Sequence, residues 1–272
     1  MTGLRVPYSG GSSAEVVPVS VVIPTLNEAA HIAGCICSVP WAGEVLVVDG
    51  GSTDGTRKVA SEFGARVLSH PGATIGGQRN EGVGAAKYPW VFALDADERA
   101  GVGLAEEIRR AIAEDQEHVY QIRRRNHFLG QEVRFGGWGS DWVVRLFPGR
   151  YRFSERRVHE SLRHTATVCR LNSTITHNPY RSLADFKRKM DRYSAWFAMD
   201  EIERGSPARV SKLVTRPPAR FLRMICLQGA FLDGWRGILL AWLSALSVFH
   251  KYRALVEMSE SRQAADCSVL DA

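Results

Sequence analysis

The sequence predicts an α/β protein with a mainly parallel sheet flanked by helices and a helical appendage at its carboxyl end. Two observations lead to this prediction. Short apolar, β-rich runs alternate with helix-like runs over the first hundred residues, which is the pattern of βαβ units. Two acidic segments, 49–55 and 95–98, each follow an apolar run. Both should therefore lie at the carboxyl edge of the sheet, where open α/β folds bind ligands.

The predicted elements follow one another at short intervals. Strands are expected at 19–23, 44–48, 66–68, 90–94, 119–125 and 143–147, and helices at 29–38, 53–63, 75–86, 104–113 and 183–204. Pro24 should end the first strand, because proline has no amide hydrogen to donate to a sheet. Ser52 or Thr53 should cap the second helix with its hydroxyl oxygen.

The composition is that of a globular protein with a basic surface. The 272 residues suffice for one α/β domain with an appendage, and 45% of them are hydrophobic. The net charge of +6 and the pI near 9.2 favour an anionic partner such as phosphates, nucleic acid or a membrane surface. The longest charge-free apolar run, 237–249, is shorter than the roughly 20 residues that span a bilayer. We therefore expect the active face to stay in the cytoplasm.

The segment Asp95-Ala96-Asp97 predicts a metal site. Side chains two residues apart share a face in an extended chain, so both carboxylates should point into one site. Mg²⁺ or Mn²⁺ held by one or two carboxylates, with substrate phosphates completing the shell, is a common arrangement. The structural alternative makes Asp97 a helix cap and Asp95 a turn former. The position of the pair after a strand favours the metal.

The glycine-rich loop 49–55 predicts a nucleotide contact without a phosphate cradle. Its glycines permit close backbone approach, and Asp49 at the strand end can accept a hydrogen bond from a base or ribose. Asp54 is expected instead to hold the loop and the following helix by local hydrogen bonds. No Lys follows the glycines, and their spacing is not Gly-x-Gly-x-x-Gly, so P-loop and dinucleotide sites are disfavoured.

Three strings, 21–28 (VVIPTLNE), 47–56 (VVDGGSTDGT) and 95–98 (DADE), resemble glycosyltransferase family 2 in order and spacing. The resemblance covers roughly residues 19–100. It implies a GT-A fold, a nucleotide-sugar donor and inversion at the anomeric carbon.

The same resemblance implies roles for single residues. It assigns Pro24, Thr25 and Glu28 to the nucleoside, Asp49 to the uracil ring, Asp95 to the ribose or the metal, and Asp97 to the metal. Arg79, within Gly77-Gln78-Arg79-Asn80, resembles a family position that contacts the nucleotide. The alternative for Arg79 is a surface position on its helix.

The later half resembles a narrower branch, the bacterial lipopolysaccharide core glycosyltransferases related to β-1,4-glucosyltransferases. The strings that carry this resemblance are 145–147 (RLF), 158–160 (VHE) and 229–237 (GAFLDGWRG). The reaction needs a general base for the acceptor hydroxyl. We expect Glu160 to be this base and His159 to be an additional metal ligand. Asp141 is the rival base, and the alternative for 159–160 is a structural pairing with nearby arginines.

The chain divides into four predicted regions. These are a flexible leader at 1–18, a GT-A catalytic domain at 19–180 (nucleotide-sugar half 19–100, acceptor half 101–180), a basic amphipathic helical region at 181–258 and a flexible tail at 259–272. Between 205 and 256 there are eight Lys or Arg and one acid, Asp233. This basic, Trp-containing segment predicts in-plane docking on an anionic membrane surface. The alternatives are a helix pair that covers the sheet or joins two copies of the chain.

The leading functional prediction is an inverting, metal-assisted glycosyltransferase, peripheral on the inner face of the cell membrane. Its donor is expected to be a UDP-sugar, UDP-glucose or a similar hexose, and its acceptor a glycolipid, lipopolysaccharide or cell-envelope glycan. Transfer to polyprenyl phosphate is the alternative reaction, and it needs no strong base because that acceptor is already anionic. A basic membrane-surface adaptor is the non-enzymatic alternative. No nucleic-acid-reading module is recognisable, so no nucleic-acid partner is expected.

Overall fold

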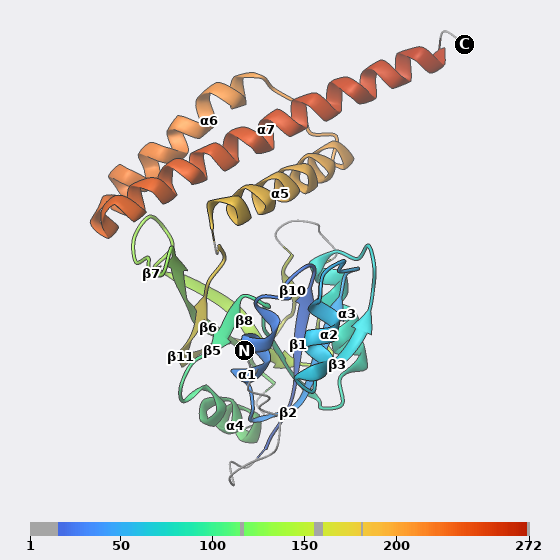
Figure 1. Ribbon diagram of the computed structural model, residues 1–272, viewed down its shortest axis with the longest axis vertical. Helices are drawn as coiled ribbons and strands as arrows, with labels where there is room; N and C mark the ends of the chain where they lie inside the picture. The colour runs from blue at the N-terminus through green and yellow to red at the C-terminus, as the bar shows by residue number, and fades with distance from the viewer. Residues whose placement is uncertain (1–15, 115–116, 155–159, 181, 271–272) are drawn as a thin grey trace, which may run out of the picture. The chain divides into compact units, whose positions relative to one another are not determined.

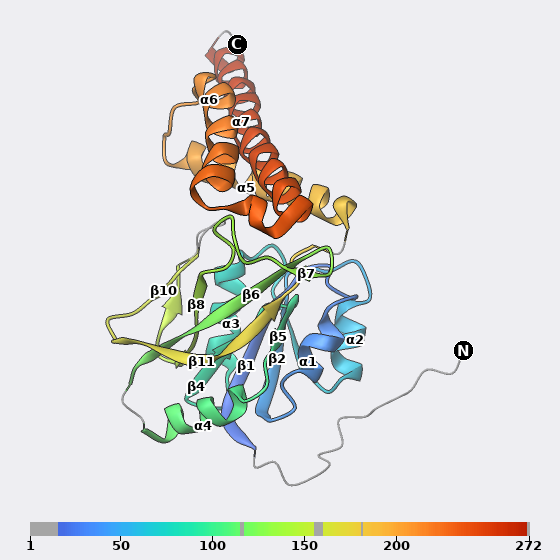
Figure 2. The ribbon, with the colours of Figure 1, turned by 90° about the vertical axis from the view of Figure 1, so that its left-hand side faces the viewer.

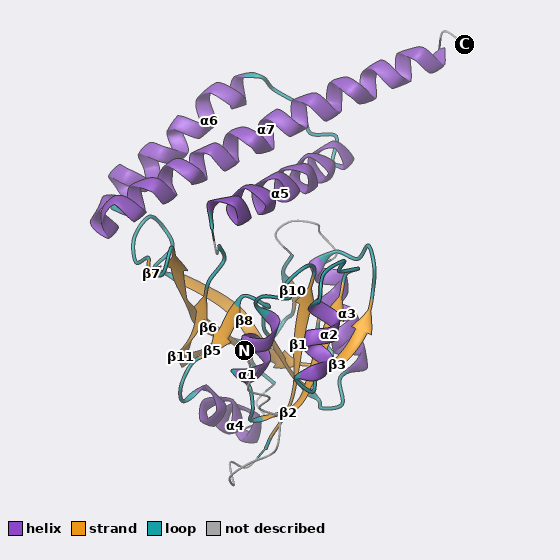
Figure 3. Ribbon diagram, viewed as in Figure 1, coloured by secondary structure: helices purple, strands orange, loops and turns teal. Residues whose placement is uncertain are grey.

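The computed structural model describes residues 16–114, 117–154, 160–180 and 182–270, with side chains described as far as Arg262. The chain forms two compact units. The first contains the residues up to 125 together with 141–154 and 160–177, and the second contains 126–140 and the residues from 178 onward. Figure 3 shows that the strands belong mainly to the first unit and the long helices to the second.

Parallel strands form one half of the sheet. They are β1 (Val17–Thr25), β2 (Ala42–Asp49), β3 (Arg66–Ser69) and β4 (Trp90–Ala93), and in the described part of the chain they lie in the order β3-β2-β1-β4 (Figure 1). Thr25 pairs with Asp49, and Val22 pairs with Ala93. This register puts the carboxyl ends of β1, β2 and β4 at one edge, as the sequence predicted.

The other half of the sheet is built from antiparallel pairs. The order continues with β8 (Asp141–Pro148), β6 (Val119–Phe128), β11 (Val168–His177) and β5 (Glu98–Ala100). The short β7 (Gln131–Glu132) pairs with the end of β6, and β9 (Arg152–Phe153) pairs with β10 (Leu162–Arg163). The predicted α/β class is confirmed, and the short strands are additions that the sequence pattern did not predict.

The first strand does not stop at Pro24, as we had expected, but continues to Thr25. The carbonyl of Val22 accepts from Leu94 N on the β4 side, and Pro24, two residues on, faces the same side. Pairing of β1 with β4 ends at Val22. The missing amide hydrogen of Pro24 therefore falls where the neighbouring strand has already ended.

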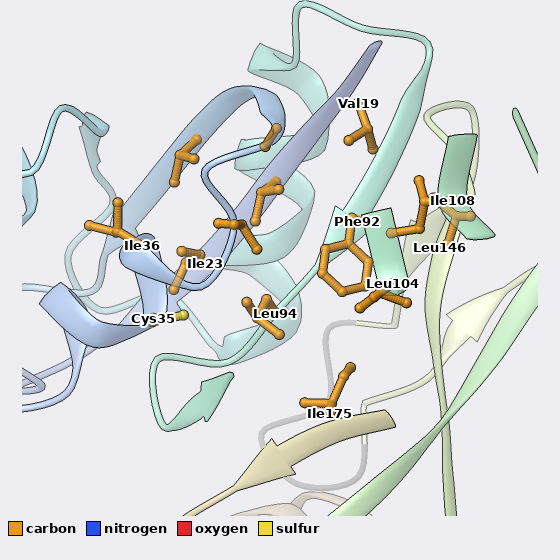
Figure 4. Close-up of a cluster of buried hydrophobic side chains, with 14 of the residues drawn as sticks. Val19, Ile23, Cys35, Ile36, Phe92, Leu94, Leu104, Ile108, Leu146 and Ile175 are labelled. Atoms are coloured by element: carbon orange, nitrogen blue, oxygen red, sulfur yellow. The ribbon is translucent and has the colours of Figure 1, made fainter. Parts of the chain in front are cut away.

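Helices cover both faces of the parallel strands. On one face, α1 (Ile32–Cys37) and α4 (Leu104–Glu114) bury their apolar residues against alternate positions of β1 (Figure 4). On the other face, α3 (Ile75–Ala85) packs against β1 and β2. A side chain at Gly82 would lie 2.3 Å from the Val22 side chain, so glycine is what lets α3 approach the sheet this closely.

The second helix begins later than predicted and has a different cap. Helix α2 (Thr56–Glu62) follows Gly55, and neither Ser52 nor Thr53 caps it. Their polar groups bind the neighbouring loop instead, because Asn27 N donates to Ser52 Oγ and Thr53 N donates to Asn27 Oδ1.

The second unit is helical. It contains α5 (Leu183–Glu203), α6 (Ser211–Leu222), a π-helical turn η1 (Arg223–Leu227), a 3-10 turn η2 (Ala230–Asp233) and α7 (Gly234–Leu270). Its core includes Phe186 and Met190 of α5, Met224 of η1, and Leu240 and Leu243 of α7. Both α5 and α6 pack along α7 (Figures 1 and 2).

Helix α7 is longer than the sequence pattern indicated. It continues to Leu270, through the segment 259–270 for which we had expected a tail. Together with η2 it forms a longer segment than the apolar run 237–249, which alone is too short to span a bilayer. By length and composition, the helical segment Ala230–Arg262 is long and apolar enough to cross a membrane.

Candidate functional site

The residues predicted to bind the nucleotide lie at the carboxyl ends of the parallel strands. Thr25 ends β1, Asp49 ends β2, and Asp95 follows β4 by two residues. Both Thr25 and Asp49 are buried, and Thr25 Oγ1 lies 3.4 Å from Asp49 Oδ1. Strand register, rather than closeness in sequence, brings these groups to one edge.

The carboxylate of Asp49 organises the glycine-rich loop that follows it. Its Oδ2 accepts hydrogen bonds from Gly51 N at 3.1 Å and from Ser52 N at 2.9 Å. Gly51 has a φ of 102°, a conformation that favours glycine. Asp49 is fully buried, and its described contacts are to this loop and to Thr25. Its contact with a uracil ring stays a prediction.

Asp54 joins the loop to its surroundings, as the sequence predicted. Its Oδ1 accepts from Thr56 N at 2.9 Å and its Oδ2 from Ala29 N at 3.2 Å. Thr56 Oγ1 in turn accepts from Glu28 N at 2.9 Å. These bonds hold the loop after β1, which contains Glu28, against the loop after β2.

Asp95 is clamped by two arginines. Its Oδ1 accepts from Arg79 Nη2, and its Oδ2 from Arg145 Nη2 at 2.6 Å. Burial raises the pKa of Asp95, but the charges of Arg145, Arg79 and Arg124 outweigh it and hold that pKa well below its usual range. Asp95 is therefore an anion under all ordinary conditions.

The clamp continues into a buried ion network. Arg145 Nη2 also donates to Glu98 Oε1 at 2.6 Å, and Arg124 Nη1 donates to the same oxygen at 3.3 Å. Arg124 also pairs with Asp141 at 2.7 Å. Glu98 is fully buried, and its Oε2 accepts from Asp95 N at 2.9 Å. Asp141, the rival base, is thus tied into this network.

The acidic motif forms a turn and is not extended. Glu98 N donates to Asp95 O at 2.9 Å, which closes a turn over Asp95–Glu98. The expectation that Asp95 and Asp97 share a face by strand alternation is therefore wrong, because that alternation requires an extended backbone.

Asp97 lies beside His177, the last residue of β11. Asp97 Oδ1 is 3.5 Å from His177 Nε2, because β11 pairs with β5 and sets His177 opposite Glu98. Burial lowers the pKa of His177, although the charge of Asp97 opposes this. Neutral imidazole and carboxylate are both ligands of Mn²⁺ and related ions.

The Asp97 carboxylate and the His177 imidazole suit a divalent cation whose remaining ligands are substrate oxygens. In residues 16–114, 117–154, 160–180 and 182–262, no group of three or more His, Cys, Asp or Glu side chains gathers at one point. The described residues therefore offer a pair of ligands, Asp97 and His177, and leave the other positions to phosphate or water, as is usual for Mg²⁺ with phosphates.

Arg79 brings Glu160 to the same network. Its Nη1 donates to Glu160 Oε1 at 2.7 Å, and its guanidinium lies 5.0 Å from the centre of the Phe153 ring. Only 6% of the Arg79 side chain is exposed, so the alternative of a surface helix arginine is wrong. Glycine at 76 makes room for this contact, because a side chain there would meet Ser154 O and Glu160 Cβ.

The structure thus brings Arg79, Asp95 and Glu160 together and sets Asp97 beside His177. His159 lies outside the described residues, and its role as a metal ligand stays a prediction. Sequence reasoning assigned no role to Arg145, Glu98 or His177. Glu98 and Arg145 lie in the strings 95–98 and 145–147, which carry the family resemblance. No sequence pattern around His177 indicates a functional role.

Comparison with known proteins identifies the family to which the sequence pattern belongs. The family model described as Glycosyl transferase family 2 matches residues 20–175. The lipopolysaccharide core biosynthesis glycosyltransferase LpsC of Rhizobium meliloti (strain 1021) is 28% identical over 259 residues, which cover 87% of this chain and 93% of LpsC. Glycosyltransferase AglJ of Haloferax volcanii is 34% identical over 132 residues, which cover 47% of this chain and 44% of AglJ.

Solved structures with related features include TarS 1-349 of S. aureus in complex with UDP. It is 13% identical with a TM-score of 0.46, and the match covers 90% of this chain and 92% of that one. Glucosyl-3-phosphoglycerate synthase of Mycobacterium tuberculosis, in complex with Mn²⁺, UDP and glucosyl-3-phosphoglycerate, is 25% identical with a TM-score of 0.34. That match covers 42% of this chain and 45% of the synthase.

Proposed function

The chain belongs to glycosyl transferase family 2, and from this membership we propose an inverting enzyme that transfers a hexose from a UDP-sugar to a lipopolysaccharide-type or other cell-envelope glycolipid. Glycosyl transfer itself follows from the family. The donor, the acceptor and the roles of single residues are the content of the proposal. UDP-glucose or a similar hexose donor comes from the resemblance of the sequence to the lipopolysaccharide core branch.

One arrangement supports the proposal most directly: the Asp97–His177 pair beside the arginine-clamped Asp95. Asp97 and His177 would hold the divalent ion, and Asp95 would orient the ribose or the ion while its charge stays compensated. A bound ion there would neutralise the diphosphate as it leaves. Thr25, Glu28, Pro24 and Asp49 would surround the nucleoside at the same strand ends.

Glu160 is the proposed general base. It would take the proton of the acceptor hydroxyl as that oxygen bonds to the anomeric carbon and the bond to UDP breaks on the opposite face. Arg79 fixes the carboxylate through Oε1. The described residues direct no hydrogen bond to Oε2, so this oxygen is left to accept the proton. Asp141 is less suited, because Arg124 directs two nitrogens to its Oδ2.

A relative and the charge of the chain support the proposed acceptor and location. LpsC acts, by its name, in lipopolysaccharide core biosynthesis, and this chain carries eight basic residues and one acid between 205 and 256. We therefore place the enzyme in the cytoplasm, peripheral on the inner face of the membrane, where a lipid-linked acceptor is within reach.

The test is a panel of UDP-sugars incubated with bacterial lipid extracts and Mn²⁺, with products found by mass spectrometry. Glu160→Gln should abolish transfer and leave Mn²⁺-dependent UDP binding intact by calorimetry. Asp141→Asn is the matched control and should keep most of the transfer activity. Full turnover by Glu160→Gln would move the base elsewhere, or favour a polyprenyl phosphate acceptor, which needs none.

A further inference from the structure

An apolar groove runs between α6 and α7 in the second unit. It has a volume of about 350 Å³ and is lined by Leu213, Pro217, Pro218, Phe221, Trp242, Ala245, Leu246 and Phe249. The α7 members recur at positions i, i+3, i+4 and i+7, and the α6 members at i, i+4, i+5 and i+8, so each set lies along one face of its helix. Trp242 is 55% exposed, which leaves the groove open to the surroundings.

A stripe of positive charge lies beside the groove, along α6 and the first residue of η1. Lys212, Arg216, Arg220 and Arg223 follow one another at intervals of four, four and three residues, which sets them along one side of the helix. No acid occurs between 211 and 227. Within the described part of the chain, none of these four cations forms an ion pair. The nearest acid in sequence, Asp233, accepts from Arg134 N and Phe135 N instead.

The charges in this stripe repel one another. Burial lowers the pKa of Arg220, and the charge of Arg223 lowers it further. Burial also lowers the pKa of Lys251 on α7, and Arg220 adds to this effect. Three cations therefore share one region with apolar surface, and a bound anion would relieve their repulsion.

Apolar exposure continues along both helices. Val214 and Leu222 of α6 are 71% and 57% exposed, and Trp235 of α7 is 58% exposed. No residue of α6 is fully buried. Large apolar side chains exposed to this extent indicate an interaction site. Apolar side chains with basic residues beside them are the composition of helices that lie in a membrane interface.

We propose that the α6–α7 groove binds one acyl chain of an anionic phospholipid while Arg216 and Arg220 bind its phosphate. The inference rests on the proposed membrane location and makes it specific to one site. A free phosphate would use the arginines and leave the groove empty. A second copy of the chain would bring two like-charged stripes together. An anionic phospholipid in a bilayer supplies both an acyl chain for the groove and a phosphate for the stripe.

Vesicle sedimentation tests the site. The full chain is mixed with phosphatidylcholine vesicles that contain or lack phosphatidylglycerol. We expect binding to depend on phosphatidylglycerol. Arg216→Gln with Arg220→Gln should weaken it about thirty-fold, because each basic residue near an anionic surface contributes roughly fivefold. The matched control, Arg57→Gln with Lys58→Gln on α2, removes two exposed charges of the first unit and should change binding less than twofold.

A second pair of substitutions tests the groove. Trp242→Asn with Phe249→Asn should weaken vesicle binding while the stripe is intact, and circular dichroism checks that the helices remain. Three results would each overturn the proposal. Millimolar glycerol phosphate could compete with vesicle binding, the α2 control could lose as much vesicle binding as the arginine variant, or the chain could bind RNA more tightly than vesicles. A dimer that the groove substitutions convert to a monomer would overturn it too. Mn²⁺-dependent UDP binding, measured on the same samples, reports separately on the proposed function.

Discussion

Replacing Arg145 with methionine removes the guanidinium that joins two carboxylates at the sheet edge. Arg145 Nη2 lies 2.6 Å from both Asp95 Oδ2 and Glu98 Oε1, and 4% of the side chain is exposed. Removing one partner of a buried ion pair costs about 3–5 kcal/mol, because an uncompensated charge stays buried. Arg79 still pairs with Asp95 and Arg124 with Glu98. We therefore expect a loss near the lower limit, about 3 kcal/mol at neutral pH.

This loss should depend on pH. Burial raises the pKa of Asp95, but the arginines, Arg145 foremost, hold it well below its usual range. A carboxyl with a lowered folded-state pKa contributes stability above its unfolded pKa of about 3.9, and this stability is lost as the pH falls through the folded value. Methionine at 145 raises the pKa of Asp95. The stability difference between wild type and variant should therefore be widest at neutral pH and narrow as the pH falls through the raised folded-state pKa of Asp95 in the variant.

Urea unfolding at neutral pH and at about pH 3, below the unfolded pKa of the carboxyl, measures the difference. Combining Arg145→Met with Glu98→Gln should recover more than half of the loss, since the buried carboxylate is then neutral. Arg66→Met is the control, because the Arg66–Glu44 pair has a 56% exposed arginine and should cost at most about 1 kcal/mol. An equal loss at both pH values, without recovery in the double variant, would refute the electrostatic explanation and indicate lost packing.

Three further changes test other parts of the site. His177→Ala should weaken UDP binding by about tenfold or more when Mn²⁺ is present, and it should have little effect after EDTA treatment. Calorimetry with and without metal measures this difference, and Asp97→Asn should give the same pattern. Gly82→Ala should cost about 1–3 kcal/mol in urea unfolding, because the added methyl meets Val22; no loss would mean that α3 shifts freely. Asp54→Ala should cost about 1 kcal/mol in the same assay by removing its loop bonds, and an unchanged midpoint would contradict their contribution.

The sequence predicted the positions of the parallel strands well, because apolar runs indicate burial directly. Each run from 19–23 to 90–94 became a strand, and register then brought Thr25, Asp49 and Asp95 to one edge. Local pattern also identified Asp54 as a loop-holding residue. The start of α2 was missed because Thr53 and Asp54, which precede the helix, bind Asn27 and Ala29 in a different loop.

The contacts of the remaining site residues could not be predicted, because long-range pairing sets their environment. His177 reaches Asp97 through the antiparallel pairing of β11 with β5, and β5 is three residues long. Arg79 occupies an ordinary helical position, and its burial depends on Phe153 and Glu160, more than seventy residues later. No local pattern in the sequence indicates such contacts.

The two aspartates of the acidic motif have different electrostatic environments, and this difference bears on their division of roles. Asp95 could ligate a metal only by giving up part of its pairing with Arg79 or Arg145. Arg79 would then keep Glu160 and Arg145 would keep Glu98, but part of a buried ion network would be lost. Asp97 faces an imidazole instead, and a carboxylate with an imidazole is itself a suitable pair of metal ligands. The clamp on Asp95 therefore positions the turn that presents Asp97, and of the two aspartates Asp97 is the better suited to hold the ion.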